Sequence, residues 1–542
     1  MSKIKKKSPA KKTARKTAPK KAPPKTVTAK SAAKKSAARK KTAHPVPPAP
    51  HLAHAPAKPA KPLKSPPQDF RVRIRMYRHG LGDCFLLSFP GKDKPLVHFM
   101  IDCGVVLGTT DPAPVMTMVA EDIKKTTLNK GNNRGEVDVL AITHEHWDHL
   151  SGFDKAQAQK VFNDIDFDKL WLAWTEDETN DLANTLREER ERKKAAALAA
   201  RKKAAKLKLT GQVERLNGLL GFFGAVAGDS SDGDDSGGGT AGALKYLKRR
   251  CNPTIIPTGG KPRSIPGVDN VRVYVLGPPE NRTDLNKTNP GKGEGYELMS
   301  GGSVGLAQTL IDACEGNDKS QPFDRLIRRK LGRMPPLHPY RLPENEWRNI
   351  DQDWLGVGER LALQLDSATN NTSLVLAFEF IDSGDVLLFV GDAQAGNWKS
   401  WDDLSFKIKD PDGDTQEVTA ADLLARTIFY KVGHHGSHNA TLKEKGLERM
   451  TSNRLAAVIP VDVNVAHNVK GWTRMPLPSI TEALKKKCTL LFQSDDITTL
   501  GKGAKQPQFI VSDETFDVYT KIKGKKSAKP VRTEHLYHDY FL

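Results

Sequence analysis

The sequence predicts an α/β fold in which layers of helices and strands enclose the hydrophobic core. Short runs rich in β-branched and aromatic residues alternate with helical segments from residue 69 onward. Few of these runs are joined by the two-residue turns that close β-hairpins. Several of them end at a histidine or an aspartate, and α/β folds place their sites at the carboxyl ends of strands.

Seven stretches are typical of strands or strand pairs. The first is a pair with a tight glycine turn, and the last ends in a histidine-rich segment. In chain order they are "RVRIRMYRHGLGDCFLLSF" (71–89), "PLVHFMIDCG" (95–104), "EVDVLAIT" (136–143), "VRVYVLGP" (271–278), "TSLVLAFEF" (372–380), "DVLLFVGD" (385–392) and "RTIFYKVGHHGSH" (426–438).

Two long stretches interrupt this alternation, and we interpret both as insertions into one domain over 69–542. The first, at about 176–250, contains a charged segment that predicts a long helix over 176–215 and a Gly- and Asp-rich segment that predicts a flexible loop over 228–242. The second, at about 283–365, is polar, with Gly and Pro early. The basic residues of the first insertion could contact nucleic acid, although a mixture of Glu and Lys is more often a solvated face.

The basic character of the chain is concentrated at its N-terminus. Residues 1–68 contain 18 Lys, 2 Arg and no Asp or Glu, so they carry +20 of the formal net charge of +21. Their Lys, Ala, Pro, Ser and Thr composition predicts a disordered tail, because it offers little to a packed core. The tail resembles those of linker histones and histone-like bacterial proteins, which implies attachment to DNA or another polyanion through counterion release. A merely solvated tail is the alternative.

The sequence shows no targeting or membrane segment. No apolar signal core follows the charged start, and the most apolar stretch, at 216–228, is too short to span a bilayer. The five cysteines are scattered without a C-x-x-C pair, which is typical of a reducing compartment and gives no cysteine zinc site. We therefore expect a soluble, cytoplasmic bacterial protein, and its basic tail would allow association with the nucleoid.

Ligand-type side chains are concentrated in "AITHEHWDHLSG" (141–152), directly after an apolar run. A single buried histidine is more often a core residue, but four ligand-type residues within six positions favour a metal site. Imidazole and carboxylate are ligands of zinc and manganese, so we expect one or two Zn²⁺ or Mn²⁺ ions. Further Asp and His residues follow other strands and can converge on the same sheet edge. The full set of expected ligands and neighbours is His144, His146, Asp148, His149, Asp392, His434, His435 and Asp102.

The pattern His-x-His-x-Asp-His after a strand resembles the signature of the metallo-β-lactamase superfamily, whose αββα sandwich holds metal at the sheet edges. Other stretches resemble the domain at the end of ComEC-type competence proteins of bacterial DNA uptake, in the family's order from about residue 72 to 498. No multi-span channel segment accompanies them, so the resemblance implies a stand-alone relative. These stretches are "GLGDCFLLSF", "MIDCG", "NNTSLVLAFEF", "LLFVGDA", "YKVGHHGSHNA", "MPLPSITEAL" and "LLFQSDD".

The resemblance implies roles for the ligand-type residues. His144 and His146 would hold one metal, Asp148 and His149 would hold the other, and Asp392 would bridge the two.

One histidine of "GHHGSH" would complete the second metal site. The His-x-Ser pattern favours His435, and His434 is the alternative. Asp102 would orient the metal ligands, or it would only form a turn at the end of its strand.

Two features depart from the family's pattern. Many members have a further metal-binding histidine before the bridging aspartate, where this chain has only His338. Asn370 or Asn371 is placed near the site instead, which leaves the first metal in question. "RMPLP" stands where the family tends to show Gly-His-Pro, so a role for that histidine is absent or moved.

Without the resemblance, the residues predict a dinuclear metal hydrolase, and phosphodiesters, carboxyl esters and lactams all fit such a centre. The ComEC-type pattern and the basic tail favour a phosphodiesterase or nuclease that cleaves DNA through a metal-bound hydroxide, with Asp148 and Asp392 essential. His438 could protonate the leaving oxygen, although a surface-loop role is at least as consistent with its position. The alternatives are a small-molecule ester, thioester or lactam hydrolase of the same fold and a non-catalytic nucleic-acid-binding protein.

Overall fold

A computed structural model of the chain describes residues 62–224, 239–291, 294–295, 356–409, 413–493, 496–499, 508–519, 521–522, 525–526 and 529–542. All of these belong to the compact unit Pro56–Leu542. Most of the predicted tail, most of the predicted loop at 228–242, His338 and Cys314 lie outside the described residues.

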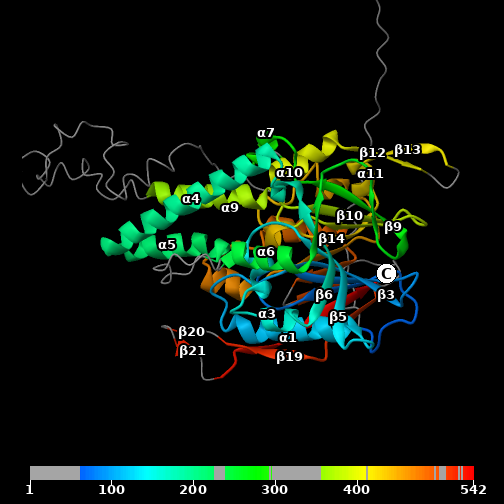
Figure 1. Cartoon of the computed structure of the whole chain (residues 1–542), viewed down its shortest axis with the longest axis horizontal. Coiled ribbons are helices and arrows are strands. Elements are labelled where there is room, and N and C mark those ends of the chain that lie inside the picture. Colours follow the sequence, from blue (N-terminus) through cyan, green and yellow to red (C-terminus); the bar gives the residue numbers. More distant parts are fainter. Residues whose placement is uncertain are drawn as a thin grey trace, which may run out of the picture. The chain divides into compact units, whose positions relative to one another are not determined.

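The fold is mixed α/β and contains two large sheets (Figure 1). The first has nine strands in the order β18-β23-β1-β2-β3-β5-β6-β7, with β4 paired to β5. Strands β3, β5, β6 and β7 run parallel. The bounds are β1 Arg73–Tyr77, β2 Cys84–Pro90, β3 Leu96–Cys103, β4 Leu128–Asn129, β5 Arg134–Ile142, β6 Ile165–Ala173, β7 Asn252–Ile256, β18 Gln508–Val511 and β23 Tyr537–Phe541.

The second sheet has eight strands in the order β17-β16-β15-β14-β11-β10-β9-β8. Strands β11, β14, β15 and β16 run parallel, so each large sheet has a parallel half and an antiparallel half. The bounds are β8 Arg263–Ile265, β9 Val268–Gly277, β10 Val375–Phe380, β11 Val386–Phe389, β14 Thr427–Lys431, β15 Ala456–Ile459, β16 Leu490–Gln493 and β17 Asp496–Thr499.

Short two-stranded sheets and helices complete the fold. The pairs are β12 Ser405–Lys409 with β13 Thr415–Thr419, β19 Thr515–Val518 with β22 Arg532–His535, and β20 Lys521–Ile522 with β21 Lys525–Lys526. The helices are α1 Pro112–Thr126, α2 Trp147–Leu150, α3 Gln159–Phe162, α4 Asp181–Lys206, α5 Thr210–Leu220, α6 Gly239–Arg250, α7 Arg282–Leu285, α9 Gly356–Asn370, α10 Ala395–Ser400, α11 Ala420–Ala425 and α12 Pro478–Lys487.

One hydrophobic cluster joins the facing sides of the two large sheets. Phe99 of β3 packs edge-on against Phe378 of β10, with ring centroids 5.1 Å apart, and Phe85 of β2 contacts Phe389 of β11 at 5.5 Å. The opposite face of each sheet is also buried, because strand side chains alternate between two cores. Helices α1, α3 and α6 cover the first sheet, and α9, α10, α11 and α12 cover the second.

All seven predicted strand stretches form strands. The predicted charged helix over 176–215 is α4 and the start of α5, and the chain turns between them at Lys208, which has a left-handed φ of 59°. The predicted loop is wrong at its end, because residues 239–242 begin α6. In the described part of the chain, no helix is long and apolar enough to cross a membrane.

Candidate metal centre

The carboxyl ends of the parallel strands bring the predicted ligands together. Asp102 lies at the end of β3, and the histidine-rich loop follows β5, its parallel neighbour. Asp392 follows β11, and the His434–His435 pair follows β14, which is parallel to β11. The convergence that the sequence predicted is therefore present.

Two glycines allow the histidine-rich loop to pack against the neighbouring turns. A Cβ on Gly82 would lie 2.1 Å from the carbonyl oxygen of Gly104, and a Cβ on Gly104 would lie 2.5 Å from the backbone nitrogen of His149. No side chain fits at such separations. The glycines of "GLGDC" and "DCG" are thus explained by close backbone contact beside the ligands.

Four residues, each with one suitable ligand atom, form what we call the acidic subsite: Asp148, His149, Asp392 and His435. Suitable ligand atoms of these buried residues all lie within 4.8 Å of one another. His435 Nε2 lies 3.0 Å from Asp148 Oδ2, and His149 Nε2 lies 3.3 Å from Asp392 Oδ2. Ligands of a tetrahedral zinc, at about 2.0–2.2 Å from the metal, are separated by about 3.3–3.6 Å, so the spacing fits a metal ion.

Neighbouring groups orient both imidazoles of the acidic subsite. The Asp102 carboxylate lies 2.7 Å from His149 Nδ1 and also accepts hydrogen bonds from the backbone and hydroxyl of Thr143. His435 Nδ1 donates to the carbonyl oxygen of Pro460 at 2.7 Å. Both histidines consequently present Nε2 to the carboxylates. Metal-binding histidines have such partners in most proteins.

Four other residues form what we call the imidazole subsite: His144, His146, Asn370 and His434. His144 Nε2 lies 3.0 Å from both His146 Nδ1 and Asn370 Oδ1. His434 Nε2 lies 3.4 Å from Asn370 Nδ2 and 4.0 Å from Asp392 Oδ2. Asp392 Oδ2 therefore faces histidines of both subsites.

The His434–His435 pair adopts an unusual backbone conformation that sends its two rings to different subsites. Both residues have left-handed φ values, 44° and 51°. Non-glycine residues pay about 1–3 kcal/mol for such conformations, and proteins keep them mostly at functional sites. The two predicted alternatives, His434 and His435, have different contacts, because His435 contacts Asp148 and His434 contacts Asn370.

Burial of negative charge is the main electrostatic feature of the centre. Asp83, Asp102, Asp148 and Asp392 are each at most 2% exposed. The buried ammonium of Lys431 pairs with Asp83, lies 3.4 Å from Asp392 Oδ1 and donates to the carbonyl of Gly391. Besides Lys431, the imidazoles of His149 and His435 face these carboxylates, so the negative charge can be offset by protons on the histidines or by a bound metal cation.

The pKa shifts divide the histidines into two groups. Burial opposes protonation of His149 and His435, yet the surrounding aspartates raise the pKa of both above the usual value. Burial lowers the pKa of His144 well below its usual value, lowers that of His146 to about 3, and lowers that of His434. The acidic subsite thus attracts positive charge, whereas the imidazole subsite offers neutral nitrogen ligands.

Several buried polar atoms of the centre have no hydrogen-bond partner among the described residues. They include His149 Nε2, Asp148 Oδ1 and His146 Nε2. Buried polar atoms are nearly always satisfied, so the orphaned atoms of Asp148 and His149, which belong to the acidic subsite, fit a site for a metal ion. The donor set of imidazole and carboxylate fits Zn²⁺ or Mn²⁺.

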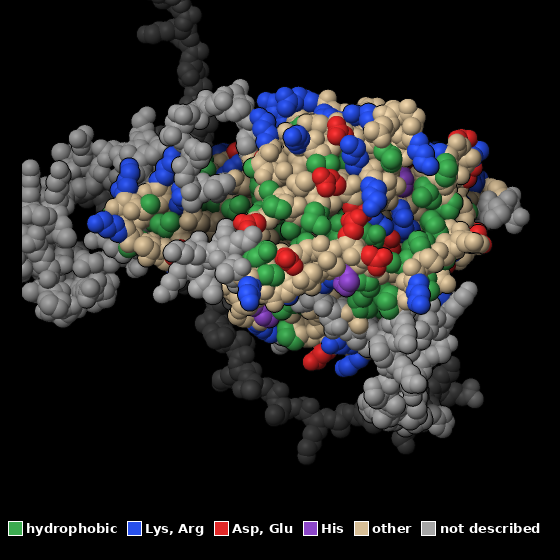
Figure 2. Space-filling view, turned by 90° about the horizontal axis from the view of Figure 1, so that it is seen from below, with side chains coloured by type: hydrophobic (Ala, Val, Ile, Leu, Met, Phe, Trp, Pro, Cys, Tyr) green, Lys and Arg blue, Asp and Glu red, His purple; other side chains and the backbone are tan. Residues whose placement is uncertain are grey.

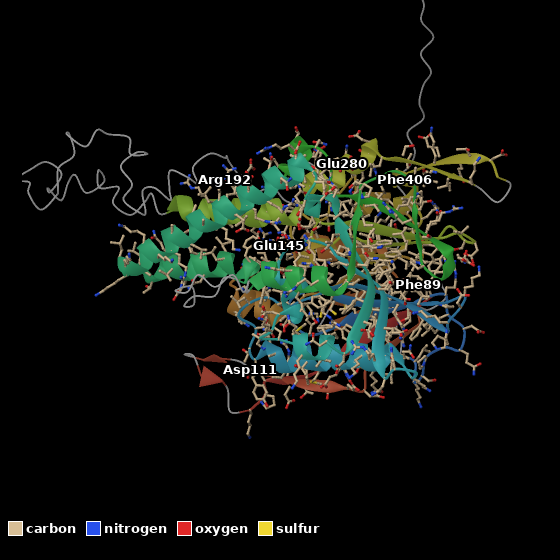
Figure 3. The ribbon with its side chains drawn as sticks, in the orientation of Figure 1. Phe89, Asp111, Glu145, Arg192, Glu280 and Phe406 are labelled. Atoms are coloured by element: carbon tan, nitrogen blue, oxygen red, sulfur yellow. The ribbon has the colours of Figure 1, made fainter. Side chains whose placement is uncertain are left out.

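The segment that the sequence predicts as the first insertion contacts the histidine-rich loop directly. Glu145 pairs with Arg190 of α4 at 2.6 Å and accepts from Thr240 of α6 at 3.1 Å. Figure 3 shows Glu145 close to these helices and away from Arg192, which lies further along α4. Phe222 and Phe223 pack on the His146 ring at 5.5 and 5.0 Å. Residues of this segment therefore pack directly against the histidine-rich loop.

Two predicted residues have other contacts. Asn371 donates from Nδ2 to the carbonyls of Asp284 and Leu285, and its Oδ1 accepts from backbone nitrogens of Gln394 and Asn397. It supports the backbone after Asp392 while its neighbour Asn370 reaches the histidines. His438 is half-buried, and its Nε2 lies 3.2 Å from Asn289 Oδ1.

Four residues close to the centre have no role predicted from the sequence: Asp83, Lys431, Asp366 and Lys470. The first two stand inside the stretches "GLGDC" and "YKVGHH", so proximity to the motifs was their available signal. Asp366 lies on α9, with Oδ1 3.9 Å from His146 Nε2, and burial raises its pKa to about 8. Neither Asp366 nor Lys470 carries a local sequence pattern.

Comparison with known proteins adds no assignment. No protein-family model, curated protein or solved structure matches this chain. A function for this chain therefore has to be argued from the geometry of the centre.

Proposed function

We propose that this chain is a metal-dependent hydrolase of the metallo-β-lactamase αββα type, and that it cleaves phosphodiester bonds of nucleic acid, with DNA as the preferred substrate. The observation that carries the proposal is the pair of adjoining subsites with Asp392 Oδ2 between them. His149 Nε2 lies 3.3 Å from this oxygen on one side and His434 Nε2 lies 4.0 Å from it on the other.

The chain's own residues would hold two divalent cations. The acidic subsite would bind one, the imidazole subsite would bind the other, and Asp392 would contact both. Such a pair acts as a Lewis acid that activates water and offsets charge on the attacking and leaving oxygens of an in-line displacement.

The neighbouring side chains would keep the ligands in place during the reaction. Asp102 and the Pro460 carbonyl fix the ring tautomers of His149 and His435 so that each presents Nε2. Lys431 offsets part of the Asp392 charge. We propose His438 as the donor of a proton to the leaving oxygen, held by Asn289.

The basic hairpin, residues 192–213 at the junction of α4 and α5, supports a polyanionic substrate. It contains no Asp or Glu and eight basic residues: Arg192, Lys193, Lys194, Arg201, Lys202, Lys203, Lys206 and Lys208. Figure 2 shows Lys and Arg side chains at the left end of the view, where α4 and α5 extend from the strands in Figure 1. Contacts of this kind to phosphates are independent of base sequence.

A substrate panel tests the proposal. Linear and closed circular DNA, RNA, bis-p-nitrophenyl phosphate, a β-lactam and a thioester are offered to the full chain and to Asp148→Ala with Mn²⁺ or Zn²⁺. We expect the full chain to cleave phosphodiesters and Asp148→Ala to lose this activity. Turnover of the thioester or lactam without phosphodiester cleavage would identify a small-molecule hydrolase instead. DNA binding without any turnover would identify a non-catalytic binding protein.

Truncation tests the roles of the tail and the basic hairpin. Deletion of residues 1–68 is expected to weaken DNA binding and flatten its salt dependence, while hydrolysis of bis-p-nitrophenyl phosphate persists. Glutamine at Lys202, Lys203, Lys206 and Lys208 is expected to reduce the slope of log K against log salt by up to about 0.9 per lysine. Unchanged slopes would assign both segments to another partner.

A further inference from the structure

Lys470 presents an unusual ammonium group beside the metal centre. It follows the π-helical turn Val465–Val469, and its backbone nitrogen donates to the Val465 carbonyl at 3.0 Å. Its Nζ lies 5.7 Å from the ring centroid of Phe222 and 5.6 Å from that of Trp472. Among the described residues, no carboxylate or carbonyl pairs with this ammonium.

The two rings beneath the ammonium come from distant parts of the chain. Phe222 belongs to the first insertion and Trp472 to the loop after β15, and they stack with centroids 5.6 Å apart and an interplanar angle of 7°. The Trp472 backbone nitrogen donates to Ala466 at 2.8 Å, which holds its loop in place. The rings therefore form a fixed support for the lysine side chain.

This support adjoins the metal ligands. Phe222 also contacts the His146 ring, with centroids 5.5 Å apart, so the lysine and the imidazole subsite share one aromatic neighbour. The Asp148 carboxylate interacts electrostatically with the ammonium. Nζ also lies 4.0 Å from the position that a Cβ on Gly108 would take, and glycine has no side chain there to contact the ammonium.

We infer that Lys470 binds a phosphate group of the substrate, and that Phe222 and Trp472 hold its ammonium beside the metal centre for this purpose. The inference rests on the proposed function. It adds that the substrate must carry an anionic phosphate next to the scissile bond. Burial lowers the lysine pKa to about 8, so the ammonium is largely protonated at neutral pH. A lysine acts on phosphate as a point charge with three rotatable donors, which suits a substrate whose phosphates approach from different angles.

Calorimetric binding of a phosphorothioate dithymidylate to the metal-loaded full chain tests this inference. Lys470→Met removes the charge with similar volume, and Lys470→Arg keeps it. The matched control is Lys407→Met, because Lys407 is an exposed lysine of β12. Metal content and melting temperature are recorded for each protein.

We expect Lys470→Met to raise the Kd by about tenfold or more, and Lys470→Arg to change it by less than about threefold. Metal content should stay the same in all variants. An unchanged Kd in Lys470→Met, an equal loss in Lys407→Met, or no binding by the unaltered chain would overturn the inference. Charge-dependent binding without hydrolysis of bis-p-nitrophenyl phosphate would support the anion site and reject the phosphodiesterase.

Discussion

The two subsites of the centre differ in charge although they lie side by side. The acidic subsite combines two carboxylates with two histidines whose pKa is raised, whereas the imidazole subsite combines neutral histidines with an asparagine. Their rings touch, since the centroids of His144 and His149 are 4.2 Å apart. We therefore expect the acidic subsite to bind a cation more strongly than the imidazole subsite, because anionic ligands attract a cation more strongly than neutral ones do.

The largest effect is expected where the two subsites meet. Asp392→Ala removes a carboxylate that faces histidines of both subsites, and it takes one of the charged partners from Lys431. We expect loss of both metal ions and a fall in kcat/KM of at least about 10³-fold, since metal ions supply several kcal/mol of transition-state stabilisation. Elemental analysis and phosphodiester kinetics measure this. Retention of two ions would contradict the position given to Asp392.

Separate variants should divide the two subsites. Asp148→Ala is expected to remove one ion and spare the other, and Asn370→Ala is expected to remove the ion that Asp148→Ala spares. The ion that remains in Asp148→Ala should dissociate at a higher free metal concentration than the ion that remains in Asn370→Ala, because the imidazole subsite has fewer charges. Isothermal titration with Zn²⁺ on each variant checks this. If both variants bound the same number of zinc ions with the same affinity, the two subsites would not bind metal separately.

The sequence predicted that most of these side chains lie close together, because strand ends and ligand-type residues are recognisable from local sequence. Asp102, Asp392 and the histidine-rich loop each follow a run whose β-pattern is evident, so their convergence could be expected from the rules of α/β sheets. The division of His434 and His435 between subsites could not, because it depends on two consecutive left-handed residues.

The remaining contributors could not be predicted because they come from distant segments. Phe222 lies in the first predicted insertion, and Asp366 lies on α9, which begins inside the second predicted insertion and ends beyond it. No local pattern specifies their packing near His146. The size of a cavity would not locate the metal centre either. A cavity of about 760 Å³ lies among Asp385, Ile428 and Thr489, near the opposite ends of the strands that carry the ligands.

A smaller effect should follow from protonation. The raised pKa of His149 and His435 means that both must lose protons before they bind metal, whereas His144 and His146 are already neutral. Affinity of the acidic subsite, measured in Asn370→Ala, should therefore rise with pH, by up to about tenfold per proton and pH unit near neutrality. Affinity of the imidazole subsite, measured in Asp148→Ala, should be nearly independent of pH between 6 and 8. Equal pH slopes would contradict the electrostatic difference.

The smallest expected effect is a change in melting temperature when Asp366 is replaced in the metal-free chain. Its pKa of about 8 in the fold lies above the value of about 4 in an unfolded chain. The fold therefore loses stability as the pH rises from about 4 to 8, and the full penalty is present above pH 8. Asp366→Asn should raise the melting temperature by a few degrees at pH 8 and leave it unchanged at pH 4.

Metal should suppress the Asp366 effect, because a cation near His146 offsets the carboxylate charge. The control is Asp403→Asn, which changes an exposed carboxylate. Scanning calorimetry with and without chelator compares the proteins. A gain for Asp366→Asn that is equal at both pH values would mean that packing, and not charge, limits this position.

The metal content of the intact chain tests the central claim most directly. The full-length protein is treated with chelator, reloaded with Zn²⁺ or Mn²⁺, desalted and analysed for metal per chain, and the same sample is assayed with bis-p-nitrophenyl phosphate. We predict one tightly retained ion, a second ion that binds only when free metal is supplied, and hydrolysis that increases with the second ion. A chain that retains no ion, and whose melting temperature does not respond to added metal, would contradict the metal centre and the function built on it.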